Sequence, residues 1–309
     1  MTALGIEIGG TKLQLVAGTH DGRLLERRRL QVDQTSGGEG IRAELAHHLP
    51  ALIQTHNPIG IGVGFGGPVD HRTGRIACSH QIQGWHQFEL GQWLHGLTRL
   101  PVAIDNDANV AALGEARHGA GIHHDPVLWI NMGSGVGGGL VVGRRIYHGA
   151  IPGEAELGHL RLDKSGTIVE ERCSGWAVDR RIREAVLLHP EGPLARHVGD
   201  ARKGEARFLA PALADHDAIA QAILSELADN LAFALSHAVH LFHPGIIVAG
   251  GGLSLIGTPL RDAIAAGLPR YVMDSFHPVP EIALAGLGED SVPAGALALA
   301  FDAAGTGQG

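Results

Sequence analysis

A strand, a glycine-rich turn and two more strands occur twice in this sequence, and this repeat constrains the fold more than any other feature. The first copy begins with Ala3–Ile8 and turns at Gly9-Gly10. The second begins with Val127–Met132 and turns at Gly133–Gly139. Segments with helical spacing of apolar residues follow both copies. A repeated supersecondary unit predicts two halves of the same mixed α/β type.

The apolar periodicity and the turn signals also predict where the longer elements lie. Strands are expected at Ala3–Ile8, Leu13–Ala17, Leu24–Val32, Ile59–Phe65, Val102–Ile104, Val127–Met132, Leu140–Val142, Ile246–Ala249 and Glu281–Ala285. Helices are expected around residues 41–52 and at Asn106–His118, Trp176–Leu188, about Asp215–Phe242, Leu260–Ala266 and Ala294–Ala303. No stretch rich in Pro or Ser separates the two halves.

Composition excludes several classes of protein. Hydrophobic residues make up 44% of the 309 residues and charged residues 18%, which excludes a disordered chain. The net charge of -8 argues against nucleic acid as a partner. Two cysteines, Cys78 and Cys173, cannot form a disulfide framework and indicate a reducing cytoplasm. The N-terminus lacks the basic region of a signal peptide, and the longest weakly polar stretch, Val127–Gly143, is rich in glycine, so no membrane segment is expected.

Three glycine clusters, each directly after a buried strand, predict binding of phosphate. Glycine lets backbone N–H groups approach an anion because no Cβ intervenes. None of the clusters has the Walker A sequence, or the dinucleotide motif GxGxxG with its acidic residue, and each could also be an ordinary hairpin turn. Two of them occupy corresponding places in the repeat, which favours one nucleotide bound between the halves. The clusters are Gly9-Gly10-Thr11-Lys12, Gly133–Gly139 and Gly250-Gly251-Gly252.

The polar run Asp105-Asn106-Asp107 lies at a predicted strand-to-helix junction. Asp and Asn are favoured N-cap residues, so a purely structural role is one interpretation. The other is a carboxylate at the C-terminal edge of a sheet, where ligands of open α/β folds bind. A carboxylate that accepts a hydroxyl proton near a phosphate site is what phosphoryl transfer to an alcohol requires. At a helix N-terminus, the Asp107 carboxyl is expected to be ionised at neutral pH.

Glu156 and His159 follow a Pro-Gly turn after the second glycine cluster. A Glu and a His three residues apart could be metal ligands, but rigidly held polar groups also suit hydrogen bonding to sugar hydroxyls. The chain has 20 histidines, so pairs such as His47-His48 arise easily and are expected to be solvated.

Together these segments resemble the ROK family of sugar kinases and related repressors, over nearly the whole chain. The motifs that carry the resemblance are Glu7-Ile-Gly-Gly-Thr-Lys12, Gly64-Phe-Gly-Gly-Pro-Val69, Asn106-Asp-Ala-Asn109, Met132-Gly-Ser-Gly-Val-Gly-Gly-Gly139 and Glu156-Leu-Gly-His159. The resemblance implies an α/β fold of two ribonuclease-H-like domains, of the actin/hexokinase ATPase type, with a cleft between them. It also implies ATP with Mg²⁺ and transfer of the γ-phosphate to a hexose hydroxyl. The last helix should return to the N-terminal domain, giving a small domain of residues 1–106 plus 291–309 and a large domain of residues 107–290.

The resemblance also assigns roles to residues at matching positions. Asp107 would be the catalytic base. The expected sugar ligands are Gly67, Asn106, Glu156, His159 and Glu170. The expected nucleotide ligands are Gly9, Gly10, Thr11, Lys12, Gly133, Ser134, Gly135, Gly250 and Gly251.

Three departures from the family pattern affect these expectations. Position 7 is Glu, where the family has an Asp that reaches toward Mg²⁺ through water, so the added methylene moves the charge. Gln81 stands where Asn is usual, which is expected to alter sugar choice. The cysteine motif CxCGxxGCxE is missing, and Cys173 alone cannot replace three thiolates of a zinc site. When Cys173-Ser174-Gly175 is aligned with the family's A-S-G, Glu170 falls on the family's sugar-binding Glu. This alignment leaves no room for the zinc loop, so no zinc is expected. The alternative for Glu170 is that it forms a solvated charge pair with Glu171.

The sequence therefore predicts an ATP-dependent hexose kinase, glucokinase-like, in the cytoplasm. A non-catalytic sugar or nucleotide sensor of the same fold and an N-acyl-hexosamine kinase are the alternatives. The chain starts directly with its first strand, which argues against the DNA-binding repressors of the family. The expected partners are a hexose and ATP, without nucleic acid or membrane, and a homodimer is compatible with them.

Overall fold

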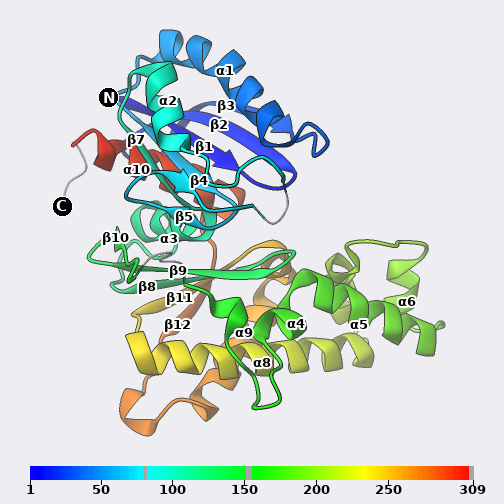
Figure 1. Ribbon diagram of the computed structural model, residues 1–309. Coiled ribbons are helices and arrows are strands. Elements are labelled where there is room, and N and C mark those ends of the chain that lie inside the picture. The colour runs from blue at the N-terminus through cyan, green and yellow to red at the C-terminus, as the bar shows by residue number, and fades with distance from the viewer. Residues whose placement is uncertain (80–81, 151–154, 306–309) are drawn as a thin grey trace. The chain divides into compact units, whose positions relative to one another are not determined.

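The computed structural model describes residues 1–79, 82–150 and 155–305, and it has the mixed α/β composition expected from the sequence (Figure 1). Gln81 lies outside the described residues. By compactness the chain divides into two units. Unit 1 comprises Met1–Asp125, Gly139–Ala155 and Gly286–Gly309, and unit 2 comprises Pro126–Gly138 and Glu156–Ala285. The domain boundaries inferred from the resemblance, after residues 106 and 290, stay a prediction.

Unit 1 is built on a sheet with the strand order β3-β2-β1-β4-β7 (Figure 1). β1 to β3 form an antiparallel meander, and β4 and β7 run parallel to β1. The carboxyl ends of β1, β4 and β7 therefore meet at one edge, where the polar residues after each strand come together. The strands are β1 (Thr2–Ile8), β2 (Lys12–Thr19), β3 (Leu24–Gln31), β4 (Ile61–Phe65), β7 (Val102–Asn106) and the separate hairpin of β5 (Val69–Asp70) and β6 (Arg75–Ile76).

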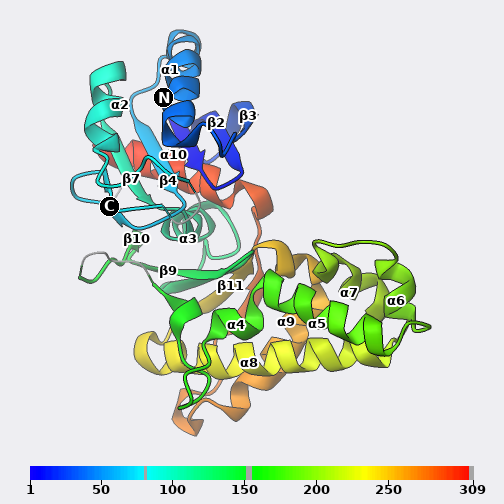
Figure 2. The same cartoon turned by 45° about the vertical axis from the view of Figure 1, so that its right-hand side comes forward.

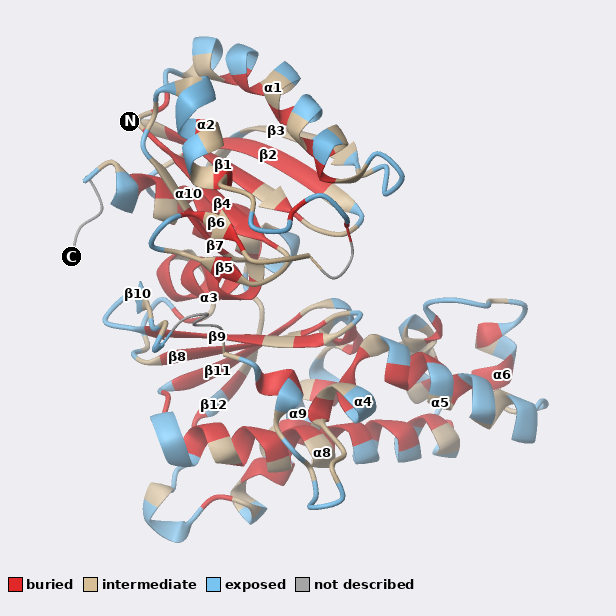
Figure 3. Cartoon of the chain, viewed as in Figure 1, coloured by how far each residue is buried: buried red, intermediate tan, exposed pale blue. Residues whose placement is uncertain are grey.

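Four helices pack with this sheet: α1 (Gly37–His56), α2 (Leu90–Thr98), α3 (Asp107–His118) and α10 (Ser291–Ala303). α1 buries Ile41, Leu45, Leu49 and Leu52, whose helical spacing predicts this helix, and Figure 3 shows that one side of α1 is buried. α10 lies directly against β4, because glycines there leave room for the helix backbone. A Cβ at Gly62 would overlap the carbonyl oxygen of Ala296, and one at Gly60 would lie 2.7 Å from that of Ala300. The close approach of α10 to the sheet, rather than turn formation, thus explains the glycines at positions 60 and 62.

A buried carboxylate fastens the start of α10 to α3. Glu115 is fully buried, and its oxygens accept hydrogen bonds from the N–H groups of Ala120, Gly286 and Leu287 and from the hydroxyl of Ser291, at 2.7–3.0 Å. Four donors on one carboxylate satisfy it without a cationic partner. Glu115 therefore holds the chain that returns from unit 2 in register with unit 1.

The second sheet has the order β10-β9-β8-β11-β12. β8 and β12 both run parallel to β11. β9 crosses the division between the units after Gly138. The strands are β8 (Val127–Met132), β9 (Val136–Val142), β10 (Arg145–Ile146), β11 (Ile246–Gly250) and β12 (Glu281–Leu284).

The helices of unit 2 pack around α8, which lies beside α4, α5 and α9 (Figure 2). α8 is the one helix in the described chain long and apolar enough to cross a membrane, but half of its most apolar window is buried inside the fold. Burial on its neighbours accounts for that apolar face. The α-helices are α4 (Val169–Cys173), α5 (Gly175–Leu188), α6 (Pro193–Val198), α7 (Leu209–Ala214), α8 (Ala218–Phe242) and α9 (Thr258–Gly267). The 3₁₀ turns of the chain are η1 (Leu157–His159), η2 (Glu205–Phe208), η3 (Gly252–Ile256), η4 (Leu268–Arg270), η5 (Asp274–Phe276) and, in unit 1, η6 (Gly288–Asp290).

Candidate active site

The junction of β7 and α3 in unit 1 brings together Asn106 and Gly67. Asn106 is the N-cap of α3, because its Oδ1 accepts hydrogen bonds from the N–H groups of Ala108 and Asn109, at 2.9 and 3.4 Å. Its Nδ2 donates to the carbonyl oxygen of Gly67 over 3.2 Å. The cap and the predicted sugar-side loop are therefore one hydrogen-bonded unit, so the structural and the functional interpretations of Asn106 are compatible.

Asp107 occupies the first position of α3 and is half-buried. Its Oδ2 lies beside Gly66, where a Cβ would be 3.3 Å away. Burial, together with the negative charge of Glu7, raises the pKa of Asp107 from 3.8 to about 6, although the N–H of Ala108 works in the opposite direction. At pH 7 the carboxyl group is mostly ionised, as expected, yet basic enough to accept a proton.

Glu7 lies near the carboxyl end of β1, the central strand of the sheet. Its carboxylate contacts the Lys12 ammonium at 3.0 Å and accepts a hydrogen bond from Gln14 Nε2 at 2.9 Å. Burial raises the pKa of Glu7, while Lys12 and Gln14 partly oppose this. The structure thus pairs Lys12, expected on a phosphate, with Glu7. The turn between β1 and β2 is closed by the Gly9 N–H, which donates a hydrogen bond to the Lys12 carbonyl at 2.9 Å.

The residues here fit a divalent cation. Glu7 and Asp107 are two carboxylates of which the first raises the pKa of the second, and added positive charge relieves that repulsion. Carboxylate oxygen is also the donor that Mg²⁺ prefers.

The glycine hairpin of unit 2, Gly133–Val136, is held from two sides. The carbonyl of Gly133 accepts a hydrogen bond from the Gly175 N–H at 2.7 Å. The N–H of Val136 donates to Glu170 Oε2 at 2.8 Å. A Cβ at position 135 would overlap Glu170 Oε2, so a larger residue there would displace this carboxylate from the Val136 N–H. The structure therefore brings Glu170, predicted as a sugar ligand, to the predicted phosphate hairpin.

Glu156 directly precedes η1, His159 is its last residue, and both are exposed. Gly158 between them packs so closely on the hairpin that a Cβ would overlap the Val136 carbonyl oxygen. All three predicted sugar ligands of unit 2 thus lie on segments that contact the backbone of Val136.

A short hairpin occupies the place where the family has its cysteine motif. The Leu162 N–H donates to the Thr167 carbonyl, and the Val169 N–H to the Leu160 carbonyl, at 2.8 and 2.9 Å. Asp163 Oδ1 closes the turn by accepting hydrogen bonds from the hydroxyl of Ser165 and two backbone N–H groups, which hold the pKa of Asp163 well below its ordinary value. Among the described residues, no group of three His, Cys, Asp or Glu side chains could hold a metal ion.

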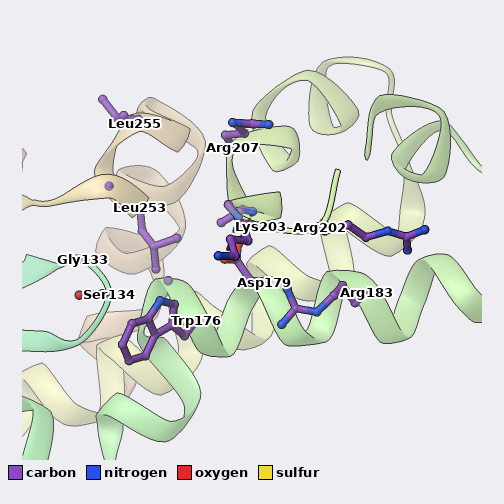
Figure 4. A pocket seen from close by; sticks show the side chains of 14 residues that line it. Gly133, Ser134, Trp176, Asp179, Arg183, Arg202, Lys203, Arg207, Leu253 and Leu255 are labelled. Atoms are coloured by element: carbon purple, nitrogen blue, oxygen red, sulfur yellow. Dashed lines mark hydrogen bonds between the residues drawn. The ribbon is translucent and has the colours of Figure 1, made fainter. Parts of the chain in front are cut away.

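Unit 2 contains a cavity of about 890 Å³ that begins at the glycine hairpin (Figure 4). Gly133 and Ser134 line it at one side, next to Trp176. Gly252 lines it from the third glycine cluster, whereas Gly250 is buried beneath the Trp129 ring and Gly251 contacts the backbone of Met132. Four cationic side chains complete the lining, namely Arg183, Arg202, Lys203 and Arg207.

Helix α5, which carries Arg183, fixes the loop that carries Arg202, Lys203 and Arg207. The Asp179 carboxylate accepts hydrogen bonds from the N–H groups of Gly204 and Ala206, at 3.2 and 2.7 Å. One turn along, Arg183 donates two hydrogen bonds of 2.9 Å to the buried Glu205. Sequence reasoning missed this loop. The available signal in the sequence was Trp176, a large aromatic residue directly after the Cys173-Ser174-Gly175 segment aligned with the family's A-S-G; in the structure it is 70% exposed.

Comparisons with known proteins identify the family and the fold. The model of the ROK family matches residues 3–303. A glucokinase of Halalkalibacterium halodurans is 31% identical over 302 residues, which cover 93% of this chain and 91% of that protein. A glucokinase of Thermotoga maritima is 28% identical and is covered to 96%, as is this chain. The crystal structure of a ROK family glucokinase from Streptomyces griseus in complex with glucose and AMPPNP has a TM-score of 0.83 and 29% identity, over 98% of this chain and 100% of that chain. The chain therefore has the actin/hexokinase-like ATPase fold and belongs to the ROK family.

Proposed function

We propose that this protein transfers the γ-phosphate of ATP to a hydroxyl group of a hexose, with Asp107 as the catalytic base. The chain is an ATP-dependent carbohydrate kinase, and this assignment rests on its family and on glucokinase relatives that match it over more than nine tenths of both chains. The pKa of Asp107, raised to about 6, is the observation that carries the choice of base.

In the proposed reaction the sugar hydroxyl oxygen attacks the γ-phosphorus. The bond between that phosphorus and the β–γ bridging oxygen breaks, and ADP leaves. The hydroxyl proton passes to the Asp107 carboxylate. Mg²⁺, held near Glu7, would neutralise charge on the phosphate oxygens. Asp107 must be deprotonated at the start, which its pKa of about 6 allows at pH 7.

The cavity of unit 2 is the proposed nucleotide site. The amide groups at Gly133–Gly135 suit a phosphate group, since two of the three residues are glycines and Ser134 adds a small hydroxyl. The exposed indole of Trp176 offers a surface for an aromatic base. Arg183 is paired with Glu205. Arg202, Lys203 and Arg207 still outnumber the one carboxylate among the described lining residues, Asp179, and this excess of positive charge favours an anionic ligand.

The proposed sugar contacts are Asn106 and Gly67 in unit 1 and Glu156, His159 and Glu170 in unit 2. Asn106 and Gly67 are already hydrogen-bonded to each other, which fixes their orientation. In unit 2 Glu170 is fixed by its hydrogen bond from the Val136 N–H, and the segment that carries Glu156 and His159 packs on the Val136 carbonyl at Gly158. Rigid polar groups of this kind select among sugar epimers by which hydroxyl they can pair with.

A coupled assay of ADP release tests the proposal, with glucose, mannose, fructose, allose, N-acetylglucosamine and N-acetylmannosamine as acceptors. We expect turnover with at least one of the four hexoses and loss of turnover by orders of magnitude in Asp107→Asn. Turnover only with the N-acylated sugars would favour an N-acyl-hexosamine kinase. Binding of sugar and ATP without ADP release would favour a sensor.

A further inference from the structure

Two histidines far apart in the sequence stack on each other in unit 1. The rings of His71 and His148 lie 3.5 Å apart between centroids and 10° from parallel. His71 belongs to the turn between β5 and β6, four residues after Gly67. His148 follows β10, whose next residue, Tyr147, is held by its N–H to the carbonyl of Leu140 at 2.8 Å. Two separate loops are thus joined by one ring contact.

The His148 ring of this stack binds the carboxylate of Asp105, the residue directly before Asn106 and Asp107. His148 Nε2 and Asp105 Oδ2 are 2.5 Å apart, and the Asp105 side chain is only 5% exposed. The other oxygen of Asp105 accepts hydrogen bonds from the Asn106 N–H at 2.8 Å and from Asn109 Nδ2 at 3.0 Å. Asp105 therefore connects His148 to the first turn of α3, where Asn106 and Asp107 lie.

We propose that the cluster of Asp105, His148 and His71 positions the Asn106–Asp107 junction for phosphoryl transfer. His148 is then a positioning residue that acts through Asp105 and touches no substrate. This inference rests on the proposed roles of Asn106 and Asp107.

Geometry explains why the cluster would affect the reaction and not only the fold. A buried carboxylate that loses its partner must reorient or admit water, since burial of an unpaired charge is costly. Asp105 can reorient only by disturbing its bonds to Asn106 and Asn109, which define the entry into α3. The same junction binds Gly67 through Asn106 Nδ2, and His71 fixes the loop that continues from Gly67. A displaced junction would therefore move both the proposed base, Asp107, and the predicted sugar contacts, Asn106 and Gly67.

Three variants separate the hydrogen bond from the stack. His148→Phe keeps a ring over His71 but removes the donor to Asp105. His148→Gln can place an amide nitrogen where Nε2 lies and should restore the bond. His197→Phe is the matched control, because His197 forms an exposed pair with Asp215 at 2.8 Å in unit 2.

We expect His148→Phe to lower kcat/KM for the sugar by about tenfold to a hundredfold, the size of effect that small misplacement of reacting groups produces. The KM for ATP should stay unchanged, His148→Gln should recover most of the loss, and His197→Phe should behave like the wild type. Hydrogen exchange of the amides at residues 106–109, measured without substrates, should accelerate in His148→Phe.

Wild-type kinetics in His148→Phe would overturn the inference. So would a loss that tracks a lower melting temperature and raises both KM values alike, because that outcome describes a purely structural role. If the wild type phosphorylates no sugar, the proposed function fails, while the exchange rates at residues 106–109 still decide whether the cluster orders the junction.

Discussion

Asp107→Asn should make the folded protein more stable while it removes catalysis. The pKa of Asp107 rises from 3.8 to about 6 on folding, mainly because burial disfavours the ionised form. A pKa unit corresponds to about 1.36 kcal/mol, so at pH 7 the ionised carboxyl group costs the folded state at most about 3 kcal/mol. The group is half-buried, and solvent screening reduces that cost to about 1–2 kcal/mol. The neutral amide of Asn occupies the same volume and avoids this cost of burying a charge.

The stability gain should depend on pH in a defined direction. The folded state binds the Asp107 proton more tightly than the unfolded chain, because its pKa is the higher one. The favourable contribution of this proton is therefore complete below the unfolded value of 3.8 and is lost as the pH rises through about 6. Wild type and Asp107→Asn should differ little at pH 4 and differ fully at pH 8.

Chemical denaturation of both proteins from pH 4 to pH 8 measures this difference. Asp200→Asn is the control, because Asp200 is exposed on a loop and its replacement should change the free energy of unfolding at no pH. The reasoning fails if Asp107→Asn is less stable than the wild type at pH 8, or if its advantage is equally large at pH 4. The wild-type kcat should fall with decreasing pH through about 6, as the base becomes protonated.

Three further substitutions test other parts of the structure. Trp176→Ala should raise the KM for ATP about tenfold in steady-state kinetics with little effect on the sugar KM, since base stacking on an aromatic ring is worth about 1–3 kcal/mol. Leu187→Ala is the control, because Leu187 is an exposed residue on the same helix. Glu115→Ala should lower the free energy of unfolding by about 3–5 kcal/mol in urea melts, because four buried donors lose their acceptor. Glu170→Ala should raise the sugar KM severalfold, and an unchanged sugar KM would remove Glu170 from the sugar site.

The long elements could be predicted because local pattern and tertiary packing agree for them. The strand expected at Val127–Met132 is β8 to the residue, and the helix expected at Asn106–His118 begins one residue later, as α3, because Asn106 is its cap. Between residues 160 and 214 only one helix was expected, and the structure adds α4, α6 and α7. Each of those is five or six residues long, too short for a helical period to show in the sequence.

The candidate site could be predicted only where neighbouring residues form it. Asn106 and Asp107 are adjacent, and their motif was sufficient to single them out. The pairing of Asp105 with His148 joins residues 43 positions apart, and no periodicity in the sequence indicates it. The cations of the cavity lining also escaped notice, because Lys203 and Arg207 resemble ordinary solvated residues until Asp179 and Glu205 are seen to fix their loop.

The absent cysteine motif changes how the sugar side of unit 2 is fixed. A metal site orients its ligands by coordination, and outer groups then orient the ligands in turn. Here hydrogen bonds take that role: Asp163 closes the hairpin that ends at Val169, and Glu170 follows directly and binds the Val136 N–H. Gly158, beside His159, rests on the carbonyl of the same Val136. The proposed sugar ligands Glu170 and His159 thus lie on segments that contact the hairpin expected to hold phosphate, so a shift of that hairpin on nucleotide binding would move both together.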